Sequence, residues 1–285
     1  MNRPAERTWQ RGVCERLDRR GFRWLLGCFG TLRETVRAGE FCRVGYRDGR
    51  WLHRFAGGVW PARRIGVPSP KVLERQTRDT FFHVVTPRDG DVVFDVGAGL
   101  GTETLTFARL VGSRGQVYAF EAHPGMAAEL ERLVALNKLQ NVTVVPMAVT
   151  AARGPVSITD LDDHVSNRLD ATAGKFQVDG ISLDEFVHQR GIDRVNFLKM
   201  NIEGAERLAL SGMTRTLAIT RHVAISCHDF LAERGGADDY RTRGLVQECL
   251  RRNGFHITTR PHDGRDWIRD YLYGSKDGAD ATAAV

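Results

Sequence analysis

Three glycines that alternate with other residues follow a short, β-branched apolar segment. The apolar segment covers residues 92–96, and the glycines are Gly97, Gly99 and Gly101. A helical pattern starts directly after them, at Thr102. Glycine lets a backbone turn tightly and approach a ligand closely, and the free N–H groups at a helix start attract an anion. This order predicts a ligand-binding loop at the end of a strand in a doubly wound α/β sheet.

The chain beyond the loop alternates strand-like and helical segments. Strands are predicted at residues 92–96, 116–121 and 142–149, with helices at 102–111 and 125–138 between them. This βαβαβ order is typical of a parallel sheet. Further strands are predicted at residues 195–200, 222–227, 255–259 and 268–273, and a helix at 242–252. We therefore predict an α/β fold with a doubly wound, mostly parallel, seven-stranded sheet.

The first quarter of the chain has a different pattern. Apolar residues recur at helical spacing over residues 22–37, and two strand-like segments flank Asp48-Gly49, a typical hairpin turn. Residues 56–70 are rich in Gly and Pro and are predicted to be a linker. We expect an N-terminal helix and hairpin extension over residues 1–75, with the helix packed on the main domain over residues 76–285. The extension is expected to cover the acceptor pocket.

Positive charge is concentrated in the same extension. Residues 1–75 contain 17 Lys and Arg against 7 Asp and Glu, or +10, which leaves 24 against 28, or −4, in the remainder of the 41 and 35. The arginines are scattered rather than in blocks, and this argues against nucleic acid as the partner.

Other features bear on the cellular compartment. No apolar stretch has the ~18 residues that a membrane-spanning helix needs, and the first fifteen residues lack the apolar core of a secretory signal. The five cysteines are odd in number and never form CxxC, which favours reduced thiols over disulfides or structural zinc. We expect a cytoplasmic protein with no membrane partner. Whether it forms a homodimer is not decided by the sequence.

The spacing of the glycines restricts the ligand. A dinucleotide fingerprint, G-x-G-x-x-G, fails because Thr102 stands at its sixth position, and no Lys-Ser/Thr pair of a P-loop follows. Glu121 ends the second strand, where a carboxylate can accept both ribose hydroxyls. A nucleoside that carries a small carboxylate fits this pattern, and we expect S-adenosylmethionine.

Four separated segments resemble the FkbM family of S-adenosylmethionine-dependent methyltransferases over residues 80–274. They are VVFDVGAGLGTETLTFA (92–108), VYAFEAHPG (117–125), ISLDEF (181–186) and VNFLKMNIEGAE (195–206). The last segment keeps Lys199, Glu203, Gly204 and Glu206 of the family pattern, but Asn201 replaces its aspartate. The resemblance implies a Rossmann-like class I methyltransferase, commonly acting on a hydroxyl of a sugar or polyketide-type metabolite.

Site residues follow from the strand ends, where ligands of such sheets bind. We expect His228 to be the general base, oriented by Asp229, with Asn201 beside them. A Mg²⁺ ion held by these three residues is the alternative, and the loss of the aspartate at position 201 disfavours it. His164, Ser166 and Asn167 lie in a polar loop between the third and fourth strands, which we expect to be an ordinary solvated loop, with contact to the substrate as the alternative. The residues expected to bind the cofactor are Asp95, Gly97, Ala98, Gly99, Gly101, Glu103, Glu121, Ala122, Ala148 and Glu203.

Two hypotheses compete with a small-molecule O-methyltransferase for secondary metabolism. One is an RNA or protein methyltransferase that binds a polyanionic acceptor through residues 1–75, which carry a net charge of +10. The other is a non-catalytic module that binds S-adenosylmethionine but lost turnover when Asn201 replaced aspartate.

Overall fold

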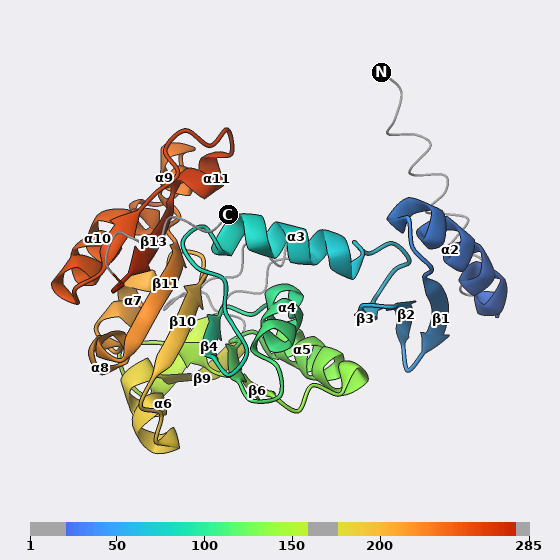
Figure 1. The fold of residues 1–285 in the computed structure, drawn as a ribbon, viewed down its shortest axis with the longest axis horizontal. Coiled ribbons are helices and arrows are strands. Elements are labelled where there is room, and N and C mark those ends of the chain that lie inside the picture. Colours follow the sequence, from blue (N-terminus) through green and yellow to red (C-terminus); the bar gives the residue numbers. More distant parts are fainter. Residues whose placement is uncertain (1–20, 159–175, 278–285) are drawn as a thin grey trace. The chain divides into compact units, whose positions relative to one another are not determined.

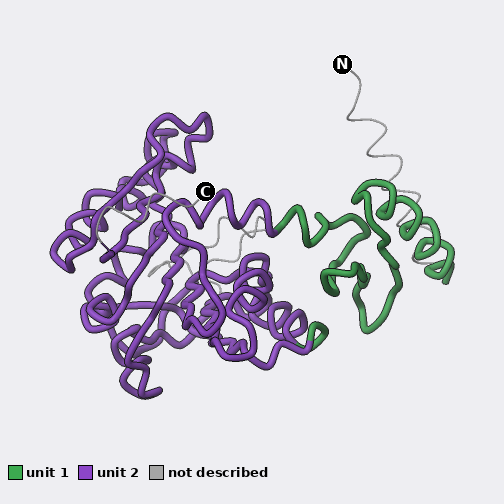
Figure 2. Tube along the Cα trace, viewed as in Figure 1, with its two compact units in different colours: residues 1–73, 135–137 green, residues 74–134, 138–285 purple. Residues whose placement is uncertain are grey.

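The computed structural model describes residues 21–158 and 176–277, and the chain divides into two compact units. The first unit extends to Leu73 and includes residues 135–137, and the second comprises residues 74–134 and those from Lys138 onward (Figure 2). The four cysteines of the described part are free. No helix within these two ranges is long and apolar enough to cross a membrane.

The first unit consists of a helix and a three-stranded antiparallel sheet (Figure 1). The helix α2 (Arg23–Ala38) ends at Gly39, which has a left-handed φ of 65°. The strands β1 (Arg43–Arg47) and β2 (Arg50–Phe55) form the predicted hairpin, and both residues of its Asp48-Gly49 turn have positive φ. A third strand, β3 (Gly58–Ala62), pairs with β2. The linker prediction is wrong for this part, because the chain turns at once and continues the sheet.

The helix α2 packs on its own sheet through small residues. A Cβ atom on Gly27 would lie 3.1 Å from the carbonyl oxygen of Val44, and one on Gly30 would lie 3.2 Å from the side chain of Ile65. Leu26 is buried, but five other large apolar side chains of the helix are between 43% and 75% exposed, namely Trp24, Leu25, Phe29, Leu32 and Val36. Much of the apolar surface of α2 is therefore left uncovered by its own sheet.

The second unit is built on a seven-stranded sheet with the order β12-β13-β11-β10-β4-β5-β6. Only β13 runs antiparallel to its neighbours. This confirms the predicted fold class. The strands in chain order are β4 (Val92–Val96), β5 (Gln116–Phe120), β6 (Val142–Val145), β10 (Val195–Met200), β11 (Thr220–Ser226), β12 (His256–Thr258) and β13 (Tyr271–Ser275).

Helices cover both faces of this sheet. Apolar side chains of α4 (Thr102–Val111) and α5 (Pro124–Asn137) pack on one face, where Phe107 and Leu130 are fully buried. The other face is covered by α6 (Leu183–Arg190), α7 (Glu206–Leu210), α8 (Thr214–Ala218) and α10 (Arg243–Arg252). This doubly wound arrangement leaves the ends of the strands accessible for binding.

Two predicted strands are divided in the structure. The segment 142–149 breaks at Pro146, which has no N–H for the ladder. The residues after it form β7 (Ala148–Val149), which joins β9 (Phe176–Ile181) and β8 (Gly154–Ile158) in a separate sheet. The segment 268–273 starts in the short helix α11 (Asp266–Arg269), since its apolar spacing fits a helical turn as well as a strand.

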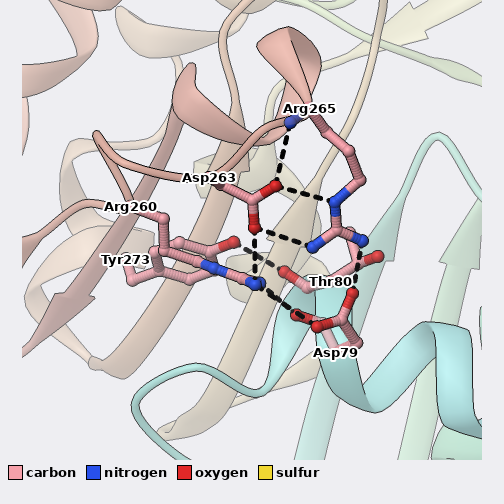
Figure 3. Close-up of polar contacts among 6 residues, drawn as sticks. All are labelled: Asp79, Thr80, Arg260, Asp263, Arg265 and Tyr273. Carbon is pink, nitrogen blue, oxygen red and sulfur yellow. Dashed lines mark hydrogen bonds and ion pairs between the residues drawn. The ribbon is translucent and has the colours of Figure 1, made fainter.

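The helix α3 (Pro70–Phe81) was not predicted, and its carboxyl end is fixed by an ionic network (Figure 3). Asp79 forms ion pairs with Arg260 at 3.3 Å and with Arg265 at 2.5 Å. Asp263 lies 2.7 Å from each of these two guanidinium groups. Tyr273 also donates a 2.7 Å hydrogen bond to the carbonyl oxygen of Thr80. These contacts fasten the end of α3 to the connection between β12 and α11.

Candidate active site

A cavity of about 300 Å³ lies at the carboxyl ends of β4, β5 and β10. The strands that follow β4 in the chain lie on both sides of it, so this is the point where the strand order reverses. Nine predicted site residues line the cavity: Gly97, Ala98, Gly99, Glu103, Glu121, Ala122, Ala148, Asn201 and Glu203. Four others do not, namely Asp95, Gly101, His228 and Asp229. His164, Ser166 and Asn167 lie outside the described residues.

Each glycine of the loop has a different constraint. All three have positive φ, between 57° and 86°. A Cβ atom on Gly97 would lie 2.0 Å from the carbonyl oxygen of Asn201, so that no side chain fits. A Cβ atom on Gly101 would lie 2.5 Å from Leu133, which places this residue in helix packing rather than in the cavity. Gly99 lines the cavity, with only Met126 nearby at 3.5 Å.

The amides of the loop are largely satisfied by neighbouring residues. Gly97 and Ala98 both donate to the carbonyl oxygen of Phe120 at 2.9 Å. Gly99 donates to Oε2 of Glu121 at 2.7 Å. Gly101 donates to the carbonyl oxygen of Ala98 at 2.9 Å. The amides of Leu100 and Thr102, near the start of α4, are therefore the ones left to meet the carboxylate of a ligand.

Glu121 holds the loop and faces the cavity. Its Oε1 accepts a hydrogen bond from the amide of His123 at 2.8 Å, in addition to the bond from Gly99. Burial raises the pKa of Glu121, and the two amide hydrogen bonds oppose that shift. Each carboxylate oxygen keeps a lone pair for a hydroxyl donor, so Glu121 can still accept hydrogen bonds from a ribose.

A buried ion pair between Lys199 and Asp95 supports the glycine loop. Nζ of Lys199 lies 2.9 Å from Oδ1 of Asp95, and both side chains are at most 1% exposed. Lys199 also donates to the carbonyl oxygen of Gly97 at 2.6 Å, and Thr104 donates to Asp95 at 2.6 Å. Asp95 therefore stabilises the loop instead of touching the ligand. Sequence reasoning gave Lys199 no role, although it belongs to the quoted motif and lines the cavity.

Glu103, at the start of α4, is the second acidic group near this pair. Burial raises the pKa of Glu103, and the charge of Lys199 opposes that shift. For Lys199 itself, burial lowers the pKa, but attraction to Asp95 and Glu103 outweighs burial, so the amine stays protonated.

Asn201 brings an unsatisfied acceptor into the cavity. Its Oδ1 is buried, and no donor among the described residues reaches it. Buried polar atoms in proteins are nearly always paired, so an orphaned acceptor that lines a cavity indicates a ligand donor. A ligand ammonium group fits this position.

His228 lies behind the cavity and between two carboxylates. Its ring is 3% exposed, with Nε2 3.4 Å from Glu203 and Nδ1 3.2 Å from Glu206. Burial alone lowers the pKa of His228, but the contacts with the two glutamates outweigh burial and raise the pKa to about 10. The imidazole thus carries a proton at neutral pH, which is not the state that a general base requires.

Asp229 does not orient His228. Its Oδ2 accepts hydrogen bonds from the amides of Thr242 and Arg243, at 3.0 and 2.9 Å, and caps α10. The expected set of Asn201, His228 and Asp229 is therefore not assembled. In the part of the chain that the structure describes, no group of three or more His, Cys, Asp or Glu side chains is arranged to hold a metal ion.

Several cavity residues have no recognisable signal in the sequence. Phe120, Met126, Met147, Val149 and Ile158 contribute apolar surface. They come from separate strands and helices, and only the fold brings them together. Apolar walls with a few converging polar groups are typical of sites for small molecules.

The strand order, the glycine loop after β4 and the carboxylate after β5 define a class I S-adenosylmethionine-dependent methyltransferase. Within this class, residues 95–273 match the model of the methyltransferase FkbM domain, and the chain belongs to that family. The family resemblance seen in the sequence is confirmed.

Two characterised relatives have modest similarity. The hexuronic acid methyltransferase AglP of Haloferax volcanii is 27% identical over 144 residues, which cover 49% of this chain and 57% of that protein. The 31-O-demethyl-FK506 methyltransferase FkbM of Streptomyces tacrolimicus is 28% identical over 209 residues, 61% of this chain and 76% of that protein. A solved FkbM methyltransferase from Methylobacillus flagellatus is 18% identical with a TM-score of 0.48, covering 72% of this chain and 50% of that one.

Proposed function

We propose that this protein transfers a methyl group from S-adenosylmethionine to a hydroxyl of a sugar- or polyketide-type small molecule in secondary metabolism. The observation that carries the proposal is the cavity at β4, with Glu121 on one side and the polar groups of Asn201 and Glu203 on the other. The names of the two relatives, one for a hexuronic acid and one for 31-O-demethyl-FK506, support this class of acceptor.

The residues of the cavity fit the donor. Bound S-adenosylmethionine supplies an electrophilic methyl group on a sulfonium. Amides at the start of α4 would bind its carboxylate, Oδ1 of Asn201 would accept from its ammonium, and Glu121 would accept from its ribose hydroxyls. Such contacts would fix the methyl group in one place, so that the protein's main task is to align an acceptor oxygen behind it.

The test uses the full chain. Calorimetry with S-adenosylhomocysteine measures the donor site, and mass spectrometry follows methylation of two probes, a glucuronic acid glycoside and 31-O-demethyl-FK506. We expect binding of S-adenosylhomocysteine and addition of one methyl group to a hydroxyl of at least one probe. Binding without transfer to either probe would instead favour the non-catalytic module.

A salt series separates the small-molecule function from an RNA or protein methyltransferase. The +10 charge of residues 1–75 is the feature that favours a polyanionic acceptor. Binding through phosphate contacts weakens steeply with salt, whereas recognition of a neutral small molecule does not. Methylation that persists at high salt supports the small-molecule function.

For the N-terminal unit, we propose a role in acceptor binding. The support is the exposed apolar side of α2, which its own sheet leaves uncovered. A Leu32→Ser/Val36→Ser double variant is expected to raise the KM for the acceptor and to leave the affinity for S-adenosylhomocysteine unchanged. An unchanged acceptor KM would exclude this role.

A further inference from the structure

We propose that Glu203 accepts the proton of the acceptor hydroxyl, and that the buried pair of His228 and Glu206 positions its carboxylate. The inference rests on the proposed methyl transfer to oxygen. It replaces the assignment of His228 as the base and gives Glu203 a role in the reaction rather than in cofactor binding.

The backbone directs Glu203 into the cavity. Its φ is 53°, in the left-handed region, and the following Gly204 has a φ of 91°. A left-handed residue other than glycine costs about 1–2 kcal/mol, and such strain collects at functional sites. The side chain is 16% exposed and lines the cavity, so its carboxylate can meet a bound substrate.

Behind Glu203, the cluster is closed to solvent. His228 contacts both Glu203 and Glu206, and the latter is fully buried. Glu206 also accepts a hydrogen bond from Oγ1 of Thr242 at 3.2 Å and lies 3.4 Å from the amide of Ile202. The imidazolium is therefore held on one side by the Glu206 carboxylate, which two hydrogen bonds fix in place. On its other side, the imidazolium holds the Glu203 carboxylate.

The surrounding ionisable groups leave this arrangement intact. Asp229 is occupied by the amides at the start of α10. Burial raises the pKa of the Cys227 thiol and of the Tyr271 phenol, so both groups are neutral at physiological pH. Two carboxylates and one imidazolium thus give the cluster a net charge of −1, and the negative charge that faces the cavity is that of Glu203.

The step balances with these groups alone. As the acceptor oxygen forms its bond to the methyl carbon, the electron pair of the carbon–sulfur bond returns to sulfur. The Glu203 carboxylate takes the hydroxyl proton and later releases it to water. The oxygen becomes strongly acidic as it gains the methyl group, so a carboxylate is a sufficient acceptor for its proton.

Several other polar groups of the cavity are less suited to this role. The Asn201 amide cannot take up a proton at neutral pH, and Lys199 already carries one. Glu121 is held by two amides on the ribose side. Glu103 is the remaining carboxyl group, and Lys199 and Asp95 lie beside it.

The experiment compares Glu203→Gln, Glu203→Asp and the surface control Glu248→Gln on an acceptor that the wild type methylates. We expect Glu203→Gln to lower kcat by about 100-fold or more, with the affinity for S-adenosylhomocysteine within twofold. Glu203→Asp is expected to recover part of the rate, and the control, whose carboxylate pairs with Arg252 on the outside of α10, to keep all of it.

A His228→Gln variant tests positioning through the separate effects on kcat and KM. Loss of the imidazolium removes the group that holds the Glu203 carboxylate, so kcat should fall while the acceptor KM and the affinity for S-adenosylhomocysteine stay within twofold. A His228 that only stabilises the fold would lower the unfolding midpoint and leave kcat of the folded protein unchanged, and this result would overturn the positioning role. A wild-type rate in Glu203→Gln overturns the assignment of Glu203 while methyl transfer stands. Failure of the wild type to methylate any probe, despite binding S-adenosylhomocysteine, removes the proposed function itself.

Discussion

The two sides of the cavity are built in different ways. On the loop side, the backbone amides of Gly97 and Glu121 donate to carbonyl oxygens of neighbouring strands, and the amide of Gly99 donates to the Glu121 carboxylate. On the opposite side, Glu203, Glu206 and His228 are held by charge, and they come from segments that are more than 20 residues apart. The cavity-facing part of the loop side thus depends on backbone shape, with the Lys199–Asp95 ion pair behind it, whereas on the opposite side a charged side chain itself faces the cavity. Substitutions should therefore affect geometry on the first side and protonation on the second.

The largest effect is expected from Gly97→Ala. Its Cβ atom would overlap the carbonyl oxygen of Asn201, and its φ of 77° disfavours a side chain. We expect a loss of about 3–5 kcal/mol in the free energy of unfolding and no binding of S-adenosylhomocysteine. Gly99→Ala is the matched control, because it has the same left-handed strain but no overlap. Denaturant unfolding and calorimetry would show whether the two variants differ as expected.

Lys199→Met should have the next largest effect. It leaves the buried carboxylate of Asp95 without its cation, and such a change typically costs about 3–5 kcal/mol. Arg153→Met breaks an ion pair on the surface with Glu185 and should leave stability unchanged. Equal unfolding midpoints for Lys199→Met and the wild type would contradict the supporting role of the pair.

Glu121→Ala is expected to weaken cofactor binding rather than folding. The variant leaves the ribose hydroxyls and the Gly99 amide without their acceptor, at a cost of ~1–3 kcal/mol in binding free energy. Calorimetric titration with S-adenosylhomocysteine measures this directly. An affinity equal to that of the wild type would exclude the assignment of Glu121 to the ribose.

A pH dependence of stability is expected from the opposite side of the cavity. The folded pKa of His228, about 10, lies above its ordinary value near 6.5. The ion pairs of His228 therefore contribute their full stability below about pH 6.5, and this contribution is lost as the pH rises through 10. The difference in unfolding free energy between wild type and His228→Gln should shrink over that interval. A constant difference would show that the imidazole is neutral in the folded protein.

The loop side could be predicted from the sequence because its constraints are local. A strand, three glycines, a helix and a carboxylate at the end of the next strand occupy one continuous stretch of the chain, and each position follows from backbone geometry. The boundaries of α4 and β10 were predicted to the residue for the same reason.

The opposite side, with Glu203, Glu206 and His228, could not be predicted in this way. Asp229 is adjacent to His228 in the sequence and was the natural partner for it, yet it caps α10 instead. The actual partners come from the segment after β10, and only the parallel pairing of β10 and β11 brings them to the ring. The helix α3 was missed although Pro70 stands at its start, a common signal for a first helical residue.

The left-handed conformation of Glu203 has a consequence for engineering. A glycine at this position would relax the backbone, which favours thermal resistance, but it would also take one carboxylate away from the buried imidazolium, which opposes it. The same exchange would delete the carboxylate proposed to serve turnover. A library at residue 203 scored for both thermal resistance and turnover would separate the contribution of the backbone from that of the carboxylate.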